Sequence, residues 1–387
     1  MSRIVVIGSG AWGTALALSL HRRGGHQVTL WAHSHEEARK ITAARENILF
    51  LPGFPIPEDL NLTADETAFA DAEIVVSVVP SEFLRPTLAR IRPHLHSGQI
   101  IVSATKGVED RTFLRMTQVI AETLVGTGSP TAAATPLDTG KEFLKQLGRA
   151  EERLATEDTG FSPFAYIAPE PGTLTGEGVS PGIAIGAVSG PSFAREVAEG
   201  DPTAITVAFE DHDVAARIQH EFSSETLRLY TSTDVIGVEL GGALKNVIAI
   251  AAGIVAGIGL GHNSAAALMT RGIAEITRLA VACGGRRETL AGLSGVGDLI
   301  LTCTGSLSRN RTVGEALGQG RNLPEILESL GGKVAEGVLT TRAALGLARL
   351  NNIEMPITEQ MELILNEGKD PREAIKSLML RPGRHEV

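Results

Sequence analysis

The stretch that most constrains this chain is residues 3–20, RIVVIGSGAWGTALALSL. Ile4 to Ile7 is a short β-branched apolar run, which is typical of a buried strand. The run leads directly into Gly8 to Gly13 (GSGAWG), and the apolar residues from Thr14 onward predict a helix. Strand, G-x-G-x-x-G and helix in this order favour a dinucleotide-binding site over a purely structural glycine turn.

Each glycine of this motif has a separate role in such a site. Gly8 allows the tight turn, Gly10 the close approach of a pyrophosphate, and Gly13 the packing of the helix against the strand. The free N–H groups at the helix N-terminus, with their partial positive charge, would hold the phosphates.

Length, charge and cysteine content limit the remaining possibilities. The chain has 387 residues, of which 43% are hydrophobic, enough for two domains with cores. Its formal net charge of −10 argues against general binding of nucleic acid. An anionic small substrate stays possible, because a local group of Lys and Arg can reverse the sign within one cleft. Cys283 and Cys303 form no C-x-x-C pair, so we expect two reduced core thiols, with one bridge as the alternative, and no metal site.

The sequence predicts neither a signal peptide nor a membrane span. The N-terminus has no distinct basic region, and its apolar run breaks at once into glycines. The longest apolar stretch, residues 247–261, is shorter than the roughly 18–20 residues that cross a bilayer. We interpret it as a buried core helix and expect a cytoplasmic protein.

Two domains are expected, residues 1–232 and residues 233–387. The first alternates strands and helices, and from Thr233 onward only helices are predicted. A dehydrogenase built this way commonly has its active site between the domains. Beyond the first strand, the segments predicted as strands are Gln27 to Trp31, Ala72 to Val79, Gln99 to Ala104, Ile183 to Val188, Thr203 to Phe209 and Thr226 to Tyr230.

Residues 127–182 interrupt the first domain. They are rich in Thr, Ala, Pro and Gly, with one amphipathic piece at residues 141–154. We expect a surface insertion that contributes nothing to catalysis.

The end of the second predicted strand bears on cofactor choice. A site that prefers NAD commonly has an acid here, which binds the ribose 2′-hydroxyl. Trp31 is instead followed by Ala32, His33 and Ser34, and the first acid is Glu36. This indicates a slight preference for NADP(H) over NAD(H), although His33 can equally be a solvated loop residue.

Two lysines are candidates for chemistry. Lys106 follows a predicted parallel strand, at the edge where open α/β sheets bind ligands. Lys245 shares a helical face with Gly241 and Gly242, which indicates close approach by a ligand or another helix. Because burial lowers the pKa of a lysine, Lys245 is suited to general acid–base catalysis. The alternatives are an exposed loop cation at Lys106 and a Lys245 that extends to the surface.

Polar residues farther along favour an anion site. Asp298 could orient a lysine or accept from a substrate hydroxyl, or it could simply cap a helix. Ser308, Arg309 and Asn310 open a predicted helix that turns Val313, Ala316 and Leu317 inward. A hydroxyl, a guanidinium and an amide at a helix N-terminus are suited to phosphate.

The motifs GSGAWGTALA, VVPSEFLR, SATKGVE, SGPSFAREV, ELGGALKNVIAIAAGI, LSGVGDLILTCTGSLSRNRTVG and VAEGVLTTRA occur in this order. Together they resemble the soluble bacterial NAD(P)-dependent sn-glycerol-3-phosphate dehydrogenases, over nearly the whole chain except residues 127–182. The resemblance implies an α/β Rossmann-type N-terminal domain, an all-α C-terminal domain and a homodimer. It also implies reversible reduction of dihydroxyacetone phosphate to sn-glycerol 3-phosphate for glycerophospholipid synthesis.

The resemblance assigns roles to individual residues. Lys245 matches the catalytic proton donor and acceptor, and Lys106 a lysine that touches cofactor and substrate. The other implied substrate contacts are Gly190, Ser192, Asp298, Ser308, Arg309 and Asn310. The other implied cofactor contacts are Gly8, Gly10, Ala11, Trp12, Gly13, His33, Phe50, Ala194, Arg309, Val334 and Glu336. Ala11 departs from the many members with Ser at this position, so backbone N–H groups would have to replace a hydroxyl contact to the pyrophosphate.

Two other functions fit parts of the sequence. One is another two-domain reductase with a catalytic lysine, such as a β-hydroxyacid dehydrogenase, and the phosphate-type cluster at residues 308–310 argues against it. The other is a nucleotide-sensing protein without turnover. The presence of Lys106, Lys245 and Asp298 together argues against that.

Overall fold

The computed structural model describes residues 1–125, 182–330, 335–383 and 385. The insertion expected at residues 127–182 therefore lies outside the described residues except for Gly182. The carbonyl of Gly182 accepts a hydrogen bond from the Gly98 N–H at 2.8 Å, just before the chain enters the next strand.

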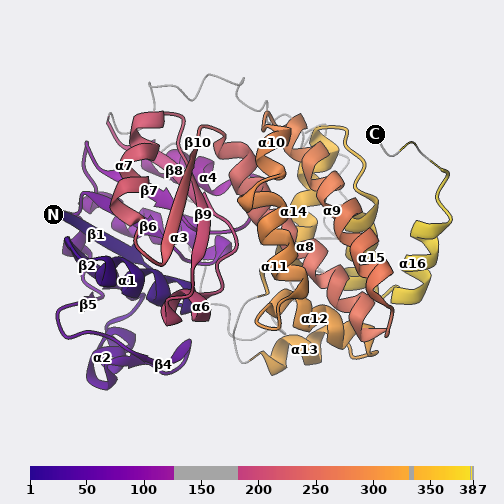
Figure 1. Cartoon of the computed structure of the whole chain (residues 1–387), viewed down its shortest axis with the longest axis horizontal. Helices are drawn as coiled ribbons and strands as arrows, with labels where there is room; N and C mark the ends of the chain where they lie inside the picture. Colours follow the sequence, from indigo (N-terminus) through magenta and orange to yellow (C-terminus); the bar gives the residue numbers. More distant parts are fainter. Residues whose placement is uncertain (126–181, 331–334, 384, 386–387) are drawn as a thin grey trace, which may run out of the picture.

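The N-terminal part of the chain forms an eight-stranded sheet in the order β10-β9-β8-β7-β6-β1-β2-β5 (Figure 1). Neighbouring strands from β5 to β8 are parallel, the β8–β9 pair is antiparallel, and β9 and β10 are parallel to each other. The strands are β1 (Ser2–Ile7), β2 (His26–Trp31), β5 (Asn61–Thr63), β6 (Ile74–Ser77), β7 (Ile100–Ser103), β8 (Ala184–Ser189), β9 (Thr203–Ala208) and β10 (Leu227–Ser232).

All seven predicted strands are present, and three short ones were not predicted. Besides β5, these are β3 (Glu46–Asn47) and β4 (Leu51–Pro55), which pair with each other outside the main sheet. Strands of two or three residues leave no apolar alternation to detect, and β4 contains two prolines and a glycine.

Helices cover both faces of the sheet. Val6 packs with Leu16 of α1 in one core cluster, whereas the adjacent Val5 packs with Leu88 of α3 in the cluster on the other face. Burial on both faces explains why the strands are continuous apolar runs rather than alternating ones. The helices of this domain are α1 (Ala11–Arg23), α2 (His35–Ala44), α3 (Ser81–Ile91), α4 (Met116–Val125), α6 (Ala194–Glu199) and α7 (His212–Phe222), with short 3₁₀ turns at Glu66–Phe69 and Arg92–His94.

The C-terminal part is helical, as predicted, throughout the residues described after Ser232 (Figure 1, orange to yellow). Its centre is α8, which packs against α9, α11, α12 and α14. The helices are α8 (Val235–Gly257), α9 (His262–Ala282), α10 (Arg287–Leu290), α11 (Asp298–Thr304), α12 (Arg309–Gly318), α13 (Leu323–Ser329), α14 (Glu336–Leu350), α15 (Pro356–Glu367) and α16 (Pro371–Met379), with a π-helical turn at Leu293–Gly297.

The helix α8 is longer than the apolar stretch in the sequence suggests. It spans 23 residues, which by length and composition would be enough to cross a membrane, but 89% of its most apolar window is buried inside the protein. The expected core helix therefore exists, with bounds of Val235–Gly257 instead of residues 247–261.

Helices α8 and α12 pack backbone against backbone. A Cβ atom on Gly253 would lie 2.1 Å from the carbonyl oxygen of Arg311, and one on Gly314 would lie 1.9 Å from the carbonyl oxygen of Ile250. Since any larger residue would force the helices apart, these glycines hold the start of α12, with Arg309, close to the helix that carries Lys245.

Candidate active site

Two lysines from different domains meet at Asp298. Lys106 lies in the loop after β7, Lys245 lies on α8, and Asp298 opens α11. Asp298 Oδ1 accepts a hydrogen bond from Lys245 Nζ, and Oδ2 accepts one from Lys106 Nζ at 2.7 Å. Asp298 is 0% exposed and Lys245 is 6% exposed, whereas the Lys106 side chain is 19% exposed, so the cluster reaches solvent only on the Lys106 side. The three residues were predicted separately, and the fold brings them together at the junction of the domains.

The surroundings of Lys245 lower the pKa of its ammonium group. Burial is the main cause that lowers its pKa to about 7; the charge of Lys106 lowers it further, while Asp298 opposes the shift. With both lysines protonated the cluster carries one net positive charge. A group whose pKa lies near the working pH can both donate and accept a proton.

Thr302 belongs to the same cluster and was not predicted. Its Oγ1 accepts a hydrogen bond from Lys245 Nζ at 2.8 Å and donates one to the backbone oxygen of Asp298 at 2.6 Å. Thr302 follows Asp298 by four residues, so both lie on one face of α11. This i, i+4 spacing is the sequence signal that could have identified it.

The two glycines before Lys245 make room for the backbone of one segment and a side chain of another. A Cβ on Gly241 would lie 2.5 Å from the carbonyl oxygen of Ser294, and one on Gly242 would lie 2.2 Å from Ser189 Oγ. The close approach expected from the sequence is therefore made by the π-helical turn and by the end of β8.

The segment after β8 is organised around the carbonyl of Gly190. This oxygen accepts hydrogen bonds from Lys106 Nζ at 3.1 Å and from Ser192 Oγ at 3.0 Å. Gly190 has a φ of 144°, and a Cβ there would lie 2.9 Å from the Cα atom of Ile205. Only glycine fits, so the position of both polar side chains depends on it.

The Ser308 to Asn310 cluster opens α12 as predicted. The Ser308 side chain caps the helix by accepting from the Arg311 N–H at 3.2 Å, and Asn310 Oδ1 accepts from the Gly337 N–H at 3.0 Å. Desolvation lowers the pKa of Arg309, and the charge of Glu336 opposes this shift. Val313, Ala316 and Leu317 are buried, as expected.

The glycine-rich turn has the shape that a dinucleotide pyrophosphate requires. Gly8 has a φ of 107°, and a Cβ on Gly13 would lie 1.9 Å from the Gly8 carbonyl oxygen. A Cβ on Gly10 would meet no protein atom within 4 Å, and no side chain caps the start of α1. Ala11 begins this helix, and Trp12 packs partly into the adjacent core. The first backbone N–H groups of α1 are thus free to bind an anion.

The Asn47 side chain holds a second segment against the glycine-rich turn. This role was not predicted. Its Nδ2 donates to the Ser9 carbonyl oxygen at 2.6 Å and to Thr14 Oγ1 at 2.8 Å, while its Oδ1 accepts from the Phe50 N–H at 3.2 Å. The turn between β3 and β4, which includes Phe50, is thereby held beside the glycine-rich turn. A single asparagine in an irregular stretch gave no signal for this role.

Three of the remaining predicted cofactor contacts lie in the described part of the chain. Glu336, at the start of α14, accepts from Ser81 Oγ of α3 at 2.8 Å, and burial raises the pKa of its carboxyl to about 7. Ala194 begins α6, and Val334 lies outside the described residues. His33 is exposed after β2, and its carbonyl oxygen accepts from Arg90 Nη1 at 2.8 Å.

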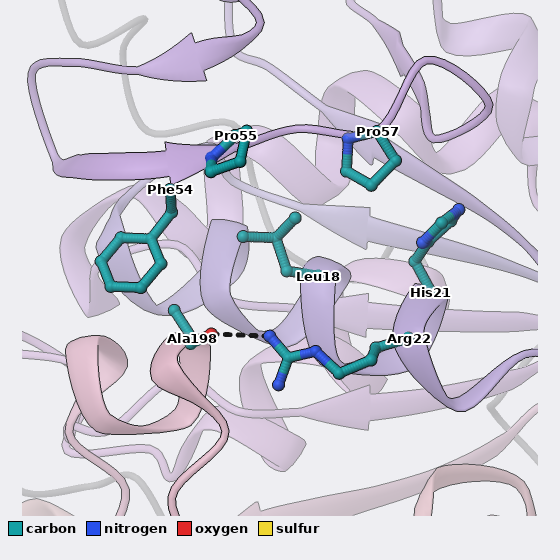
Figure 2. Close-up of a pocket in the computed structure, with 7 residues that line it drawn as sticks. All are labelled: Leu18, His21, Arg22, Phe54, Pro55, Pro57 and Ala198. Atoms are coloured by element: carbon teal, nitrogen blue, oxygen red, sulfur yellow. Dashed lines mark hydrogen bonds between the residues drawn. The ribbon is translucent and has the colours of Figure 1, made fainter.

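A separate pocket of about 440 Å³ lies at the other end of α1. Figure 2 shows its lining, which contains none of the predicted site residues: Leu18, His21, Arg22, Phe54, Pro55, Pro57 and Ala198. The Arg22 guanidinium donates to the Ala198 carbonyl oxygen at 2.6 Å. This pocket therefore does not belong to the lysine cluster.

No group of three or more His, Cys, Asp and Glu side chains that could hold a metal ion occurs in the part of the chain that the structure describes. Cys283 and Cys303 are free. Burial raises the pKa of both thiols, to about 11 for Cys283 and about 12 for Cys303, which makes them poor nucleophiles.

A Rossmann-type domain with an open glycine-rich turn, joined to a helical domain through two lysines that share one buried carboxylate, defines a two-domain dehydrogenase that uses a nicotinamide dinucleotide. Comparison with family models agrees. The N-terminal model of NAD-dependent glycerol-3-phosphate dehydrogenase matches residues 3–132 and 175–215, and the C-terminal model matches residues 234–376. The chain belongs to the NAD-dependent glycerol-3-phosphate dehydrogenase family, which confirms the resemblance seen in its motifs.

Individual relatives agree with this assignment. Proteins named glycerol-3-phosphate dehydrogenase (NAD(P)+) from Koribacter versatilis and Acidobacterium capsulatum are each 52% identical, over 388 and 390 residues; both alignments cover 100% of this chain, and 99% and 100% of the relative. The crystal structure of glycerol-3-phosphate dehydrogenase from Coxiella burnetii matches with a TM-score of 0.80 at 33% identity, covering 98% of this chain and 99% of that one. The expected fold class is thereby confirmed.

The comparisons also bear on the predicted insertion. The family model leaves residues 133–174 unmatched. The alignments with the two 52% identical relatives nevertheless run through the whole chain. The segment is thus an addition to the family's common sequence that these two relatives match in length.

Proposed function

We propose that this enzyme catalyses the reversible NAD(P)H-dependent reduction of dihydroxyacetone phosphate to sn-glycerol 3-phosphate and so supplies glycerophospholipid synthesis. The names of the 52% identical relatives support the reaction. The observation that carries the proposal is the meeting of Lys106 and Lys245 at one buried carboxylate between the domains. A ketone bound there would have a proton donor and a second positive charge beside its oxygen.

Lys245 is the proposed proton carrier. The bound nicotinamide supplies the hydride. As the substrate carbonyl carbon is reduced, its oxygen gains negative charge, and protonated Lys245 gives its proton to that oxygen. An O–H bond forms and an N–H bond of the ammonium breaks, leaving a neutral amine that burial favours. In the reverse direction neutral Lys245 takes the proton of the alcohol.

Lys106 and Asp298 are proposed to support this transfer. The Lys106 ammonium stabilises the developing oxyanion, an electrostatic contribution that a preorganised charge makes in an active site. Asp298 accepts hydrogen bonds from both lysines, so it holds them on the same side of the site.

The phosphate of the substrate is proposed to bind at the start of α12. Arg309 supplies a guanidinium, and Ser308 and Asn310 stand on either side of it at a helix N-terminus. Such a site suits a phosphate dianion. Gly190 and Ser192, which contact each other beside Lys106, are proposed to complete the substrate pocket. Holding the phosphate would fix the angle of the ketone.

We propose a slight preference for NADP(H) over NAD(H). The cofactor would lie on the turn of Gly8, Gly10 and Gly13. No acid ends β2, and the guanidinium of Arg90 lies beside His33, 4.9 Å from the centre of the Trp31 ring. Because Arg90 also pairs with Glu66, the proposal rests mainly on the missing acid at the end of β2, which would otherwise repel a 2′-phosphate. A kcat/KM for NADPH far below that for NADH would contradict this proposal.

Three organisational features are also proposed. The domains divide at residues 1–232 and 233–387, which is supported by the end of β10 at Ser232 and the start of α8 at Val235. The homodimer is supported by the resemblance and would be tested by analytical ultracentrifugation. A cytoplasmic location is supported by the two free cysteines.

The central test is oxidation of NADPH by the purified full chain with dihydroxyacetone phosphate. The control substrates are unphosphorylated dihydroxyacetone and a β-keto acid. We expect rapid oxidation only with the phosphorylated ketone, because the other two lack the group that Arg309 would bind. Preferential use of the keto acid would favour a β-hydroxyacid dehydrogenase, and cofactor binding without turnover would favour a nucleotide sensor.

A further inference from the structure

The loop that carries Lys106 is embedded in the other domain. It runs from the end of β7 to the start of α4, at residues 104–115. Val108, 3% exposed, belongs to the core cluster of the helical domain together with Leu240 and Leu244 of α8. Phe113 has a φ of 57°, unusual for a residue with a side chain, and its ring fills the space above Gly346 of α14. The helical domain therefore imposes the shape of this loop.

Glu239 of α8 holds the C-terminal end of the same loop. Its Oε1 accepts from the Thr117 N–H at 2.8 Å, and its Oε2 accepts from Thr117 Oγ1 at 2.7 Å and from Arg115 Nη1. Thr117 is in the first turn of α4, so the carboxylate caps that helix from the other domain. Glu239 is 7% exposed, and its position leaves little freedom for the loop end.

Glu239 and the proposed proton carrier, Lys245, lie on the same helix. Glu239 precedes Lys245 by six residues of continuous helix, about 9 Å along the axis. The loop is also closed on itself, since Val108 pairs with Arg115 in an isolated β-bridge. Lys106, two residues before Val108, is thus linked to α8 through this bridge and Glu239 as well as through Asp298.

We propose that Glu239 is a positioning residue: by holding Arg115 and Thr117 against α8, it sets the place of Lys106 relative to Lys245. This inference rests on the proposed function of the two lysines. Glu239 itself touches neither substrate nor cofactor in this scheme. Its removal would let the loop relax away from α8, which would separate the two ammonium groups.

The chain contains a matched control for the helix-capping chemistry. Glu275 of α9 is 3% exposed and caps α15 by accepting from the Ile357 N–H at 2.7 Å, the Thr358 N–H at 3.3 Å and the Thr358 hydroxyl. It is a buried carboxylate that caps a helix, as Glu239 is, but both of its helices belong to the helical domain. Its loss would affect stability without moving Lys106.

The experiment compares Glu239→Gln with Glu275→Gln in the full chain. For each we would measure kcat and KM with dihydroxyacetone phosphate, NADPH affinity by fluorescence, and Tm. We expect both variants to lower Tm. Only Glu239→Gln should lower kcat, by about ten- to a hundredfold, because small displacements of reacting groups have effects of this size. NADPH affinity should stay within about twofold of the wild type, since the glycine-rich turn is untouched.

The pH profile supplies a readout that loss of stability would not change. Asp298, Lys106 and the Thr302 hydroxyl face Lys245, and the Lys106 charge helps to keep its pKa low. If Lys106 moves away in Glu239→Gln, the fall of reduction activity with rising pH should shift to higher pH. In Glu275→Gln this limb should stay where it is in the wild type.

Each outcome decides between the possibilities. If Glu239→Gln matches Glu275→Gln in kcat and pH profile, Glu239 is a structural cap and the inference is wrong. If Glu239→Gln does not fold, the variant Arg115→Met tests the inference instead, because it leaves the hydrogen bonds between Glu239 and Thr117 in place. An unchanged kcat in Arg115→Met would overturn the inference. Partial recovery of kcat in Arg115→Lys would support it. A wild type that does not reduce dihydroxyacetone phosphate would instead overturn the proposed function.

Discussion

At the scale of single residues, the site combines two ammonium groups with a single carboxylate. Asp298 is the acceptor for two ammonium groups, and its carboxylate is fully buried. Because Lys245 is buried and a second ammonium group lies beside it, the pKa of Lys245 is lowered.

Lys245→Met keeps much of the length of the side chain and removes the proton carrier. Turnover should fall by about 10²- to 10⁴-fold, the usual contribution of general acid–base catalysis. NADPH affinity should survive, and Tm should hold or rise slightly because Asp298 keeps Lys106 as its partner and a buried charge is gone. Steady-state kinetics and fluorescence titration of one preparation would test this. Near-normal kcat in the variant would end the proposed role and make Lys106 the next candidate.

The dependence of activity on pH should differ in sign between the two directions. Reduction needs protonated Lys245, whose pKa is lowered to about 7. The kcat/KM for dihydroxyacetone phosphate should therefore fall as pH rises through this value, while that for glycerol 3-phosphate oxidation should rise. Profiles of both directions measured in the same buffers would check the prediction. A pair of profiles that rise and fall together would exclude a single shared proton carrier.

Arg309→Ala tests the phosphate site. Loss of a charge-assisted contact costs roughly 1.5–3 kcal/mol, about ten- to a hundredfold in kcat/KM for dihydroxyacetone phosphate. Both KM and kcat should change, because binding of the remote phosphate helps to orient the ketone. Unphosphorylated dihydroxyacetone is the control, and its slow reaction should be unaffected. Equal kcat/KM for wild type and variant would remove Arg309 from the site.

At the scale of elements, the place of the phosphate site relative to Lys245 is set by glycines. The backbones of α8 and α12 touch at Gly253 and Gly314, so the distance between the helices has almost no tolerance. The start of α12 is only a few residues from this contact. A change in helix spacing would consequently reach Arg309.

Gly314→Ala should wedge the two helices apart. The added Cβ would lie 1.9 Å from the Ile250 carbonyl oxygen, and we expect the free energy of unfolding to fall by about 1–3 kcal/mol, as for other overpacked cores. The KM for dihydroxyacetone phosphate should also rise. Gly383→Ala, whose Cβ would meet nothing within 4 Å, is the control. Denaturant unfolding and kinetics would test both effects, and a stable variant with normal KM would show that the spacing is adjustable.

At the scale of the whole molecule, catalysis is expected to need the two family-matched domains and not the segment that interrupts the match to the N-terminal one. Replacing residues 133–174, which the family model leaves unmatched, with a short Gly-Ser linker should preserve folding and kcat. Circular dichroism and NADPH oxidation would check this. A folded variant without turnover would mean that the segment contributes to the site or to an active assembly.

Much of this molecule could be predicted from sequence because its signals are local. The β-branched run before Gly8 and the hydroxyl of Ser308 before α12 act on their own neighbours, and both elements form as expected. The reversed direction of β9 leaves no such signal, since a strand buried on both faces is apolar whichever way it runs. Asn47 was missed for the same reason, because its partners at Ser9 and Thr14 are set by tertiary packing, whereas the spacing of Thr302 from Asp298 was a local signal that was overlooked.

Because Val108 packs in the core of the helical domain, the folding and unfolding of the two domains should be coupled. The ribosome releases residues 104–115 before any of α8, so an essential part of the second hydrophobic core is already present when its helices emerge. The helical core thus includes a residue of the N-terminal domain, and a small cluster joins Ala187 and Ala208 to Val235 and Val238 of α8. We therefore expect the two domains to melt in a single cooperative transition, and the amide protons of β7 and α8 to exchange with closely similar opening free energies.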